Sequence, residues 1–129
     1  MTKKDIHITE AELEILQVLW DKKEATVKEV HEELSAEREA VYTTTLKQMQ
    51  VMHEKGLLKR DDSRRQHIYY PDVDIKRVQR KFMDKVMKNL FSGNAGELVM
   101  NALSNYKTTP EELEQIKTLI EKAKQAKKL

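Results

Sequence analysis

The chain has 129 residues, of which 39% are hydrophobic and 36% charged, and its 24 lysines and arginines against 22 aspartates and glutamates give a net charge of +2. Because it contains only 3 glycines and 2 prolines, we expect a folded, helix-rich domain rather than a disordered or loop-rich one. Cysteine is absent, which excludes disulfides and thiolate metal sites, and no apolar run has the length of a signal peptide or a membrane span, so we expect a cytoplasmic protein without membrane insertion.

Two segments near the start carry the same signal for the beginning of a helix. Thr9 is followed three residues later by Glu12, and Thr26 by Glu29, so each pair can form a capping box. Apolar residues follow at three-to-four spacing, and they are Leu13, Leu16, Leu19 and Trp20 after the first pair and Val27, Val30 and Leu34 after the second. The pattern predicts two helices, each with one face in a core.

A third periodic segment has one apolar and one polar side. The apolar positions are Tyr42, Leu46, Met49 and Met52, and Gly56 follows as a helix stop. The opposite side carries Thr43, Thr44, Lys47, Gln48 and Val51. Residues 43–81 contain ten bases and five acids, whereas residues 10–39 contain ten acids and four bases. A basic zone of this kind can neutralise phosphates, and an ordinary solvated surface is the alternative interpretation.

Two β-prone runs flank a turn-rich segment after the third helix. Residues 57–60 form the first run and residues 67–70 the second, with Arg64 and Arg65 in the polar turn between them. Three helices followed by a hairpin is the order of a winged helix-turn-helix, and we expect residues 1–72 to form such a domain. The predicted fold class is therefore mainly α with a small β-hairpin.

From residue 74 the pattern returns to helices with apolar stripes, interrupted at residues 91–96, and Thr109 with Pro110 marks the start of the last helix. These helices have little mass in which to bury their stripes within one copy. We therefore expect residues 73–129 to form a helical dimerisation domain, and the alternative is that they fold back on the first domain. The predicted dimer contacts are Phe82, Val86, Leu90, Leu98, Val99, Leu103, Ile116 and Ile120.

No motif in the chain supports catalysis. His31 and His53 are each followed by glutamate, as in zinc protease motifs, but neither has a second histidine four residues later. The histidines lack metal-ligand spacing and there is no glycine-rich phosphate loop, so we expect no enzyme activity, no metal and no cofactor. A protein adaptor is a further alternative, but the nearly acid-free polar side of the third helix favours DNA as the partner.

Several short motifs occur in a specific joint order. They are Leu19-Trp20, Tyr42-Thr43-Thr44 with Leu46 and Met49, Glu54-Lys55-Gly56-Leu57, Tyr69-Tyr70-Pro71, and Phe91-Ser92-Gly93 with Leu98-Val99. In this order the chain resembles the penicillinase repressor family of BlaI-, MecI- and CopY-type winged-helix repressors, from residue 8 to residue 99.

The resemblance implies a homodimeric transcriptional repressor that recognises a palindromic DNA operator, often one controlling resistance or stress genes. The residues expected to reach base edges or phosphates in the major groove are Thr43, Thr44, Lys47 and Gln48. Arg64 and Arg65 are expected at the DNA backbone or an adjacent minor groove, where their contribution weakens with salt.

The chain departs from the family pattern in its recognition helix and in its switches. The family commonly has an arginine where this chain has Val51, so one phosphate contact is missing or replaced. In the β-lactam branch a repressor is inactivated by proteolysis at an Asn-Phe bond. The matching position here is Asn101-Ala102, which lacks the aromatic residue, so a sensor protease is only a candidate partner. Copper-branch members bind metal through cysteines, and the absence of cysteine excludes that switch.

Overall fold

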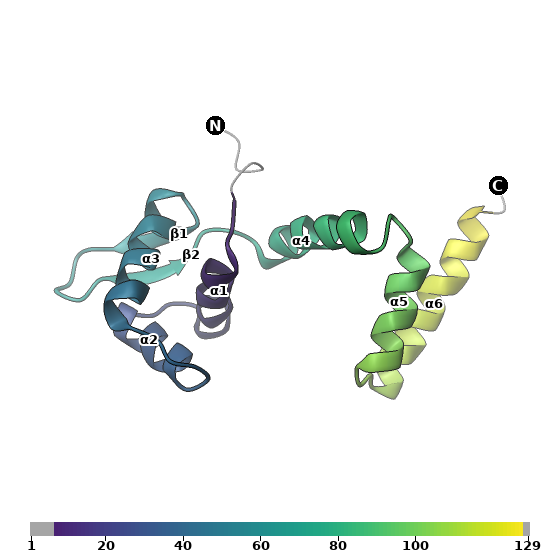
Figure 1. Ribbon diagram of the computed structural model, residues 1–129, viewed down its shortest axis with the longest axis horizontal. Coiled ribbons are helices and arrows are strands. Elements are labelled where there is room, and N and C mark those ends of the chain that lie inside the picture. The colour runs from purple at the N-terminus through teal and green to yellow at the C-terminus, as the bar shows by residue number, and fades with distance from the viewer. Residues whose placement is uncertain (1–6, 128–129) are drawn as a thin grey trace. The chain divides into compact units, whose positions relative to one another are not determined.

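The computed structural model describes residues 7–127 and confirms a mainly α protein with a small hairpin (Figure 1). In chain order the elements are α1 (Glu10–Lys22), α2 (Val27–Ser35), α3 (Tyr42–Glu54), β1 (Leu58–Asp61), β2 (Ile68–Pro71), α4 (Ile75–Leu90), α5 (Ala95–Asn105) and α6 (Pro110–Lys127). The chain divides into two compact units, residues 1–80 and residues 81–129. The first unit holds the hairpin and the helices before it, and the second holds α5 and α6.

Local capping determines where α1 and α2 begin. The Glu12 N–H donates to Thr9 Oγ1 at 3.1 Å, and the Thr9 N–H donates to Glu12 Oε1 at 3.0 Å. The same reciprocal pair joins Thr26 and Glu29, with distances of 2.8 and 3.2 Å. Both predicted capping boxes are therefore confirmed, and each satisfies N–H groups that the first turn of a helix otherwise leaves without a partner.

The core of the first unit lies between α1, α2, α3 and the hairpin, which pack on one another. Its largest fully buried side chains are Ile15, Leu16, Leu19, Val30, Met49, Met52, Leu57, Leu58 and Tyr69. Burial of each such side chain stabilises the fold by about 1.5–3 kcal/mol relative to its exposure. The buried face of α1 differs slightly from the predicted one, because Ile15 is fully buried whereas Leu13 and Trp20 are half-buried.

Trp20 lies at the edge of this core, where its polar end finds a partner. Its Nε1–H donates to the carbonyl oxygen of Val73 at 3.1 Å, which ties the segment before α4 to α1. Val78, in the first turn of α4, is also buried. The first compact unit consequently continues into α4 as far as residue 80, past the boundary that we expected at residue 72.

A buried ion pair joins the beginning of α1 to the end of α3. The Lys55 Nζ lies 2.8 Å from Glu12 Oε1 and 2.9 Å from Glu12 Oε2, and Glu12 is only 6% exposed. The same carboxylate accepts the Thr9 N–H in the capping box. One side chain therefore both starts α1 and holds α3 against it, and the capping pattern alone does not predict this second role.

The hairpin is anchored to the helices at both of its ends. Gly56, with φ of +85°, ends α3 in the left-handed conformation that favours glycine and directs the chain into β1. β1 and β2 pair antiparallel, with Leu58 opposite Pro71. Ala25, just before α2, forms a bridge with Tyr69 through two N–H to O bonds of 2.9 and 2.8 Å. The hairpin with its connecting residues 62–67, hereafter the wing, is thus fixed against α1 and α3 and beside the start of α2.

The helices α5 and α6 bury none of their side chains within a single chain. The Asn94 side chain caps α5 by accepting the Glu97 N–H at 2.9 Å, and a capping box of Thr109 and Glu112 starts α6 with two bonds of 3.0 Å. Exposed large apolar side chains from α4 onward are Met83, Leu90, Val99, Met100, Leu103, Tyr106, Leu113, Leu119 and Ile120. The helices are well terminated, but their apolar stripes are not covered in one copy.

Candidate nucleic-acid interface

The helix α3 presents a row of exposed side chains opposite its buried face. The buried residues of α3 are Thr45, Met49 and Met52. On the opposite side, Thr43, Lys47 and Val51 follow one another at intervals of four residues and are exposed. We call these three residues the outward row. It contains Thr43 and Lys47 from the predicted set of DNA contacts, but not Thr44 and Gln48.

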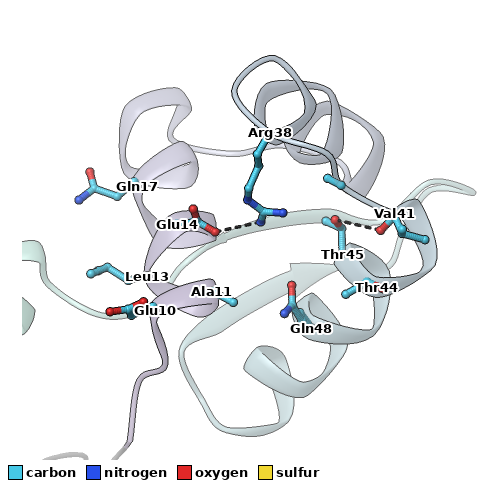
Figure 2. Close-up of a pocket in the computed structure, with 11 residues that line it drawn as sticks. Glu10, Ala11, Leu13, Glu14, Gln17, Arg38, Val41, Thr44, Thr45 and Gln48 are labelled. Atoms are coloured by element: carbon cyan, nitrogen blue, oxygen red, sulfur yellow. Dashed lines mark hydrogen bonds and ion pairs between the residues drawn. The ribbon is translucent and has the colours of Figure 1, made fainter.

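Thr44 and Gln48 lie on the flank of α3 that faces α1 (Figure 2). They border a groove of about 720 Å³, and its other lining residues are Glu10, Ala11, Leu13, Glu14, Gln17, Arg38, Ala40, Val41 and Thr45. Arg38 Nη2 donates to Glu14 Oε1 across this groove at 2.9 Å, and Glu10 adds a second carboxylate. Because carboxylates repel phosphates, this flank suits the DNA backbone less well than the outward row does.

The other flank of α3 borders a cleft of about 260 Å³ between the start of α2 and the wing. Its lining residues are Thr26, Val27, Lys28, Tyr42, Leu46, Gln50, Arg65, Gln66, His67 and Tyr69. We call it the wing cleft. None of these residues is an acid, Lys28 and Arg65 are basic, and several can donate hydrogen bonds. Such a lining suits a phosphodiester backbone, which is read mainly through its charge and its phosphate oxygens.

Besides hydroxyl-bearing residues, four polar residues of the wing cleft are missing from the predicted contact set, namely Lys28, Gln50, Gln66 and His67. They come from α2, α3 and the wing, and only the folding of the wing against the two helices brings them together with Arg65. For Gln50 a signal existed, because it follows Lys47 by three residues and so lies on a neighbouring part of the same helix surface. For the other three, helical or strand periodicity contains no such signal.

The acids of the wing are held by the wing itself, which leaves its tip cationic. Asp62 Oδ1 accepts a hydrogen bond from Arg60 Nε at 2.6 Å, and Asp61 Oδ1 accepts the Ser63 N–H at 2.9 Å. Hydrogen bonds from Ser63, together with the nearby Arg64, lower the pKa of Asp61. Within residues 7–127, Arg64 and Arg65 form no ion pair, and both are exposed. Their guanidinium groups are therefore available to an external anion.

The amino terminus of α3 lacks a side-chain cap. Val41 occupies the capping position and is 63% exposed, its apolar side chain cannot accept an N–H bond from the first turn, and that turn contains no acid. The starts of α1 and α2, by contrast, are closed by capping boxes. Since a helix amino terminus carries a partial positive charge, an anion is favoured there. The open start of α3 is thus compatible with a phosphate at this end of the helix.

The predicted dimer contacts lie on α4, α5 and α6, and their side chains are half-buried or exposed in a single chain. Four are half-buried, namely Phe82, Val86, Leu98 and Ile116. Four are exposed, namely Leu90, Val99, Leu103 and Ile120. Further exposed apolar residues that the prediction leaves out are Met83, Met100, Tyr106, Leu113 and Leu119. The apolar surface available to a partner chain is therefore larger than the predicted set.

The candidate cleavage bond lies inside a regular helix. Asn101 and Ala102 are exposed and belong to α5. The Asn105 Nδ2 donates to the Asn101 carbonyl oxygen at 3.0 Å and to its side-chain oxygen at 3.1 Å. A protease that needs an extended substrate must unwind this part of α5 before it can cut the bond.

His31 and His53, which begin the two zinc-protease-like motifs, each pack against a tyrosine ring. His31 packs edge-on against Tyr42 at a ring distance of 5.6 Å, and His53 packs in the same way against Tyr69 at 6.5 Å. In the part of the chain that the structure describes, no cluster of three metal-ligating side chains is formed and no helix has the length and apolarity to cross a bilayer.

A family model described as penicillinase repressor matches residues 8–122. The chain belongs to the penicillinase repressor family. The methicillin resistance regulatory protein MecI of Mammaliicoccus sciuri is 23% identical over 122 residues, which cover 95% of this chain and 99% of that protein. The penicillinase repressor of Bacillus licheniformis is 26% identical over 126 residues, which cover 98% of each chain.

A solved structure extends this relation to the fold of the first unit. The solution structure of the DNA-binding domain of the repressor BlaI superposes with a TM-score of 0.52 at 29% sequence identity, and covers 59% of this chain and 93% of that one. The predicted winged helix is thereby confirmed. As a penicillinase repressor family member, the chain is a DNA-binding transcriptional repressor and not an enzyme.

Proposed function

We propose that this repressor binds a two-fold symmetric operator as a homodimer, with the outward row of α3 in the major groove and the wing cleft along the DNA backbone. The observation that carries the proposal is the asymmetry of charge around α3. The wing cleft has two bases and no acid among its lining residues, whereas the groove on the opposite flank contains Glu10 beside the ion pair of Glu14 with Arg38. Because phosphates are anionic, this asymmetry favours the wing side of α3 for the backbone.

The proposed contacts divide according to their position around α3. Thr43 and Lys47, on the outward row, are proposed to reach base edges or phosphates in the major groove. Thr44 and Gln48 are proposed to contact DNA from the flank beside α1. At the wing tip, Arg64 and Arg65 are proposed to bind the DNA backbone or the adjacent minor groove. The wing-cleft residues are proposed to hold one DNA strand between the wing and α3.

The proposed dimer uses the uncovered apolar stripes of α4, α5 and α6. These stripes include Leu90, at 72% exposure, and Val99, at 42% exposure. Burial of each large apolar side chain against a second copy contributes about 1.5–3 kcal/mol before the cost of association. A two-fold symmetric dimer then requires a two-fold symmetric operator, with half-sites about one helical turn of DNA, or a multiple of it, apart.

Release from the operator is proposed to follow loss of the dimer. A sensor protease that cuts at Asn101-Ala102 would divide α5 and so remove apolar surface on which the proposed dimer depends. The protein is proposed to act in the cytoplasm, where a bacterial operator would be accessible to it.

The proposal is tested by an electrophoretic mobility shift with the full chain. Duplexes are first selected from a random library, and the selected site is compared with random duplex at matched salt. We expect a palindromic consensus and an affinity for it at least about a thousandfold above that for random duplex. Equal affinity for the two duplexes, or a consensus without two-fold symmetry, contradicts the proposal.

A further inference from the structure

The outward row of α3 ends in an apolar side chain. Val51 is 36% exposed and stands on the side of α3 opposite the buried Met49 and Met52. The other two members of the row, Thr43 and Lys47, are polar and can contact either phosphates or base edges. Val51 has no polar atom beyond its backbone, so its side chain cannot form a hydrogen bond with DNA.

The neighbourhood of Val51 is also unsuited to phosphate. Glu54, three residues later on the same helix surface, is exposed, and within residues 7–127 it forms no ion pair. A carboxylate beside an apolar side chain disfavours a phosphate at this end of the row, through charge repulsion and through the cost of desolvating the phosphate. If the row enters the major groove, as the proposed function requires, the neighbourhood of Val51 favours base edges over the backbone as its contact.

The major groove offers one apolar group for such a side chain to recognise. Of the four base pairs, only those with thymine present a methyl group there, and the other distinguishing features are hydrogen-bond donors and acceptors. Valine suits this contact because its branched Cβ leaves essentially one side-chain conformation in a helix, so its methyl groups are held in place before DNA binds. We propose that Val51 reads the 5-methyl group of a thymine in each half-site of the operator. This inference rests on the proposed function.

Helix geometry limits where the thymine can lie. Lys47 and Val51 are four residues apart, which corresponds to a rise of about 6 Å along α3. Successive base pairs of DNA are about 3.4 Å apart, so the thymine lies within about two base pairs of the position that Lys47 contacts. The two-fold symmetry of the proposed complex places an equivalent thymine in the other half-site.

The test replaces single thymines of the selected operator by uracil, which removes the methyl group and leaves the hydrogen-bonding groups of the base unchanged. Binding of the full chain is measured for each substituted duplex. We expect one symmetric position at which uracil weakens binding by about threefold to tenfold, the range for loss of a buried methyl contact. Replacement of the thymine–adenine pair by 5-methylcytosine–guanine keeps the methyl group but changes the hydrogen-bond pattern in the groove. Comparison with the uracil duplex then ranks the methyl contact against hydrogen bonds to this base pair.

Variants of Val51 and one control link this position to the side chain. In Val51→Ala, the thymine-to-uracil ratio of affinities at that position should fall to about one, whereas Val18→Ala, a change at a half-buried valine of α1, should leave the ratio as in the unaltered protein. Val51→Thr keeps one methyl group and should retain part of the ratio. Thermal unfolding of each variant checks that the fold is retained.

The outcomes separate this inference from the proposed function. If the chain selects no operator, both fail. If it binds a palindromic operator but no uracil substitution matters, or if the uracil effect persists in Val51→Ala, the proposed function stands and the role of Val51 is overturned. A uracil effect that disappears only in Val51→Ala supports the role.

Discussion

The ion pair between Glu12 and Lys55 is expected to stabilise the first unit more than an exposed ion pair of the same unit does. In Lys55→Met, the new side chain keeps the apolar stem of lysine but leaves the Glu12 carboxylate, 6% exposed in the fold, without its cation. Leaving a buried charge unpaired costs about 3–5 kcal/mol. Because the Lys55 side chain is 28% exposed, solvent screens part of the interaction, and we expect a loss of about 2–3 kcal/mol in the free energy of unfolding.

Urea unfolding measures this loss through the single tryptophan of the chain. The Trp20 indole bonds to the Val73 carbonyl at the edge of the first unit, so its fluorescence should change when α1 separates from the rest. For a domain of this size the dependence on urea is about 1–2 kcal/mol per molar. The unfolding midpoint of Lys55→Met should therefore fall by about 1–3 M.

Lys59→Met is the matched control, because it removes an exposed ion pair from the same unit. Lys59 Nζ lies 3.8 Å from Asp72 Oδ1, and its side chain is 60% exposed. A pair of this kind contributes less than about 1 kcal/mol. Equal midpoints for Lys55→Met and Lys59→Met would refute the reasoning. A second check is the double variant with Glu12→Gln, whose loss should be smaller than the sum of the two single losses.

Three further predictions concern DNA binding and assembly. Val41→Asn and Val41→Asp should each cap α3 and raise the free energy of unfolding by about 0.5–1 kcal/mol. Only Val41→Asp should weaken operator binding, because it puts a negative charge where a phosphate is expected. Equal weakening by both variants in a mobility shift would contradict this prediction. Arg64→Ala with Arg65→Ala should weaken binding to all duplexes and lower the slope of log affinity against log salt by about 2 for each half-site, or about 4 for the dimer, and an unchanged slope would remove the wing tip from the phosphate contacts. Leu103→Glu should shift the full chain from dimer to monomer in analytical ultracentrifugation, whereas Lys122→Glu, on the polar side of α6, should not; a dimeric Leu103→Glu protein would place the interface elsewhere.

The features of this protein that the amino-acid sequence determined by itself are local in the chain. The capping boxes at Thr9 and Thr26 form between residues three apart, so the pattern contained both partners, and α1 and α2 begin where it predicted. The helix stop at Gly56 depends on one residue that tolerates a positive φ. Helical periodicity likewise put Met49 and Met52 on the buried side of α3 and Thr43 and Lys47 on the exposed side. It was wrong for Tyr42, which is 43% exposed, and it did not predict that Thr45 is buried.

Contacts between distant segments were decided only by the tertiary structure. Periodicity assigned Thr44 and Gln48 to the same polar side as Lys47, but the packing of α1 against α3 puts both at the edge of a groove that contains carboxylates. The wing cleft joins Lys28 to residues of α3 and of the wing, and no spacing rule connects residues of three separate elements. The second role of Glu12, as the partner of a lysine 43 positions away, has the same origin. Spacing along a helix or strand specifies which side of one element a residue occupies, whereas its neighbours from other elements depend on how those elements pack.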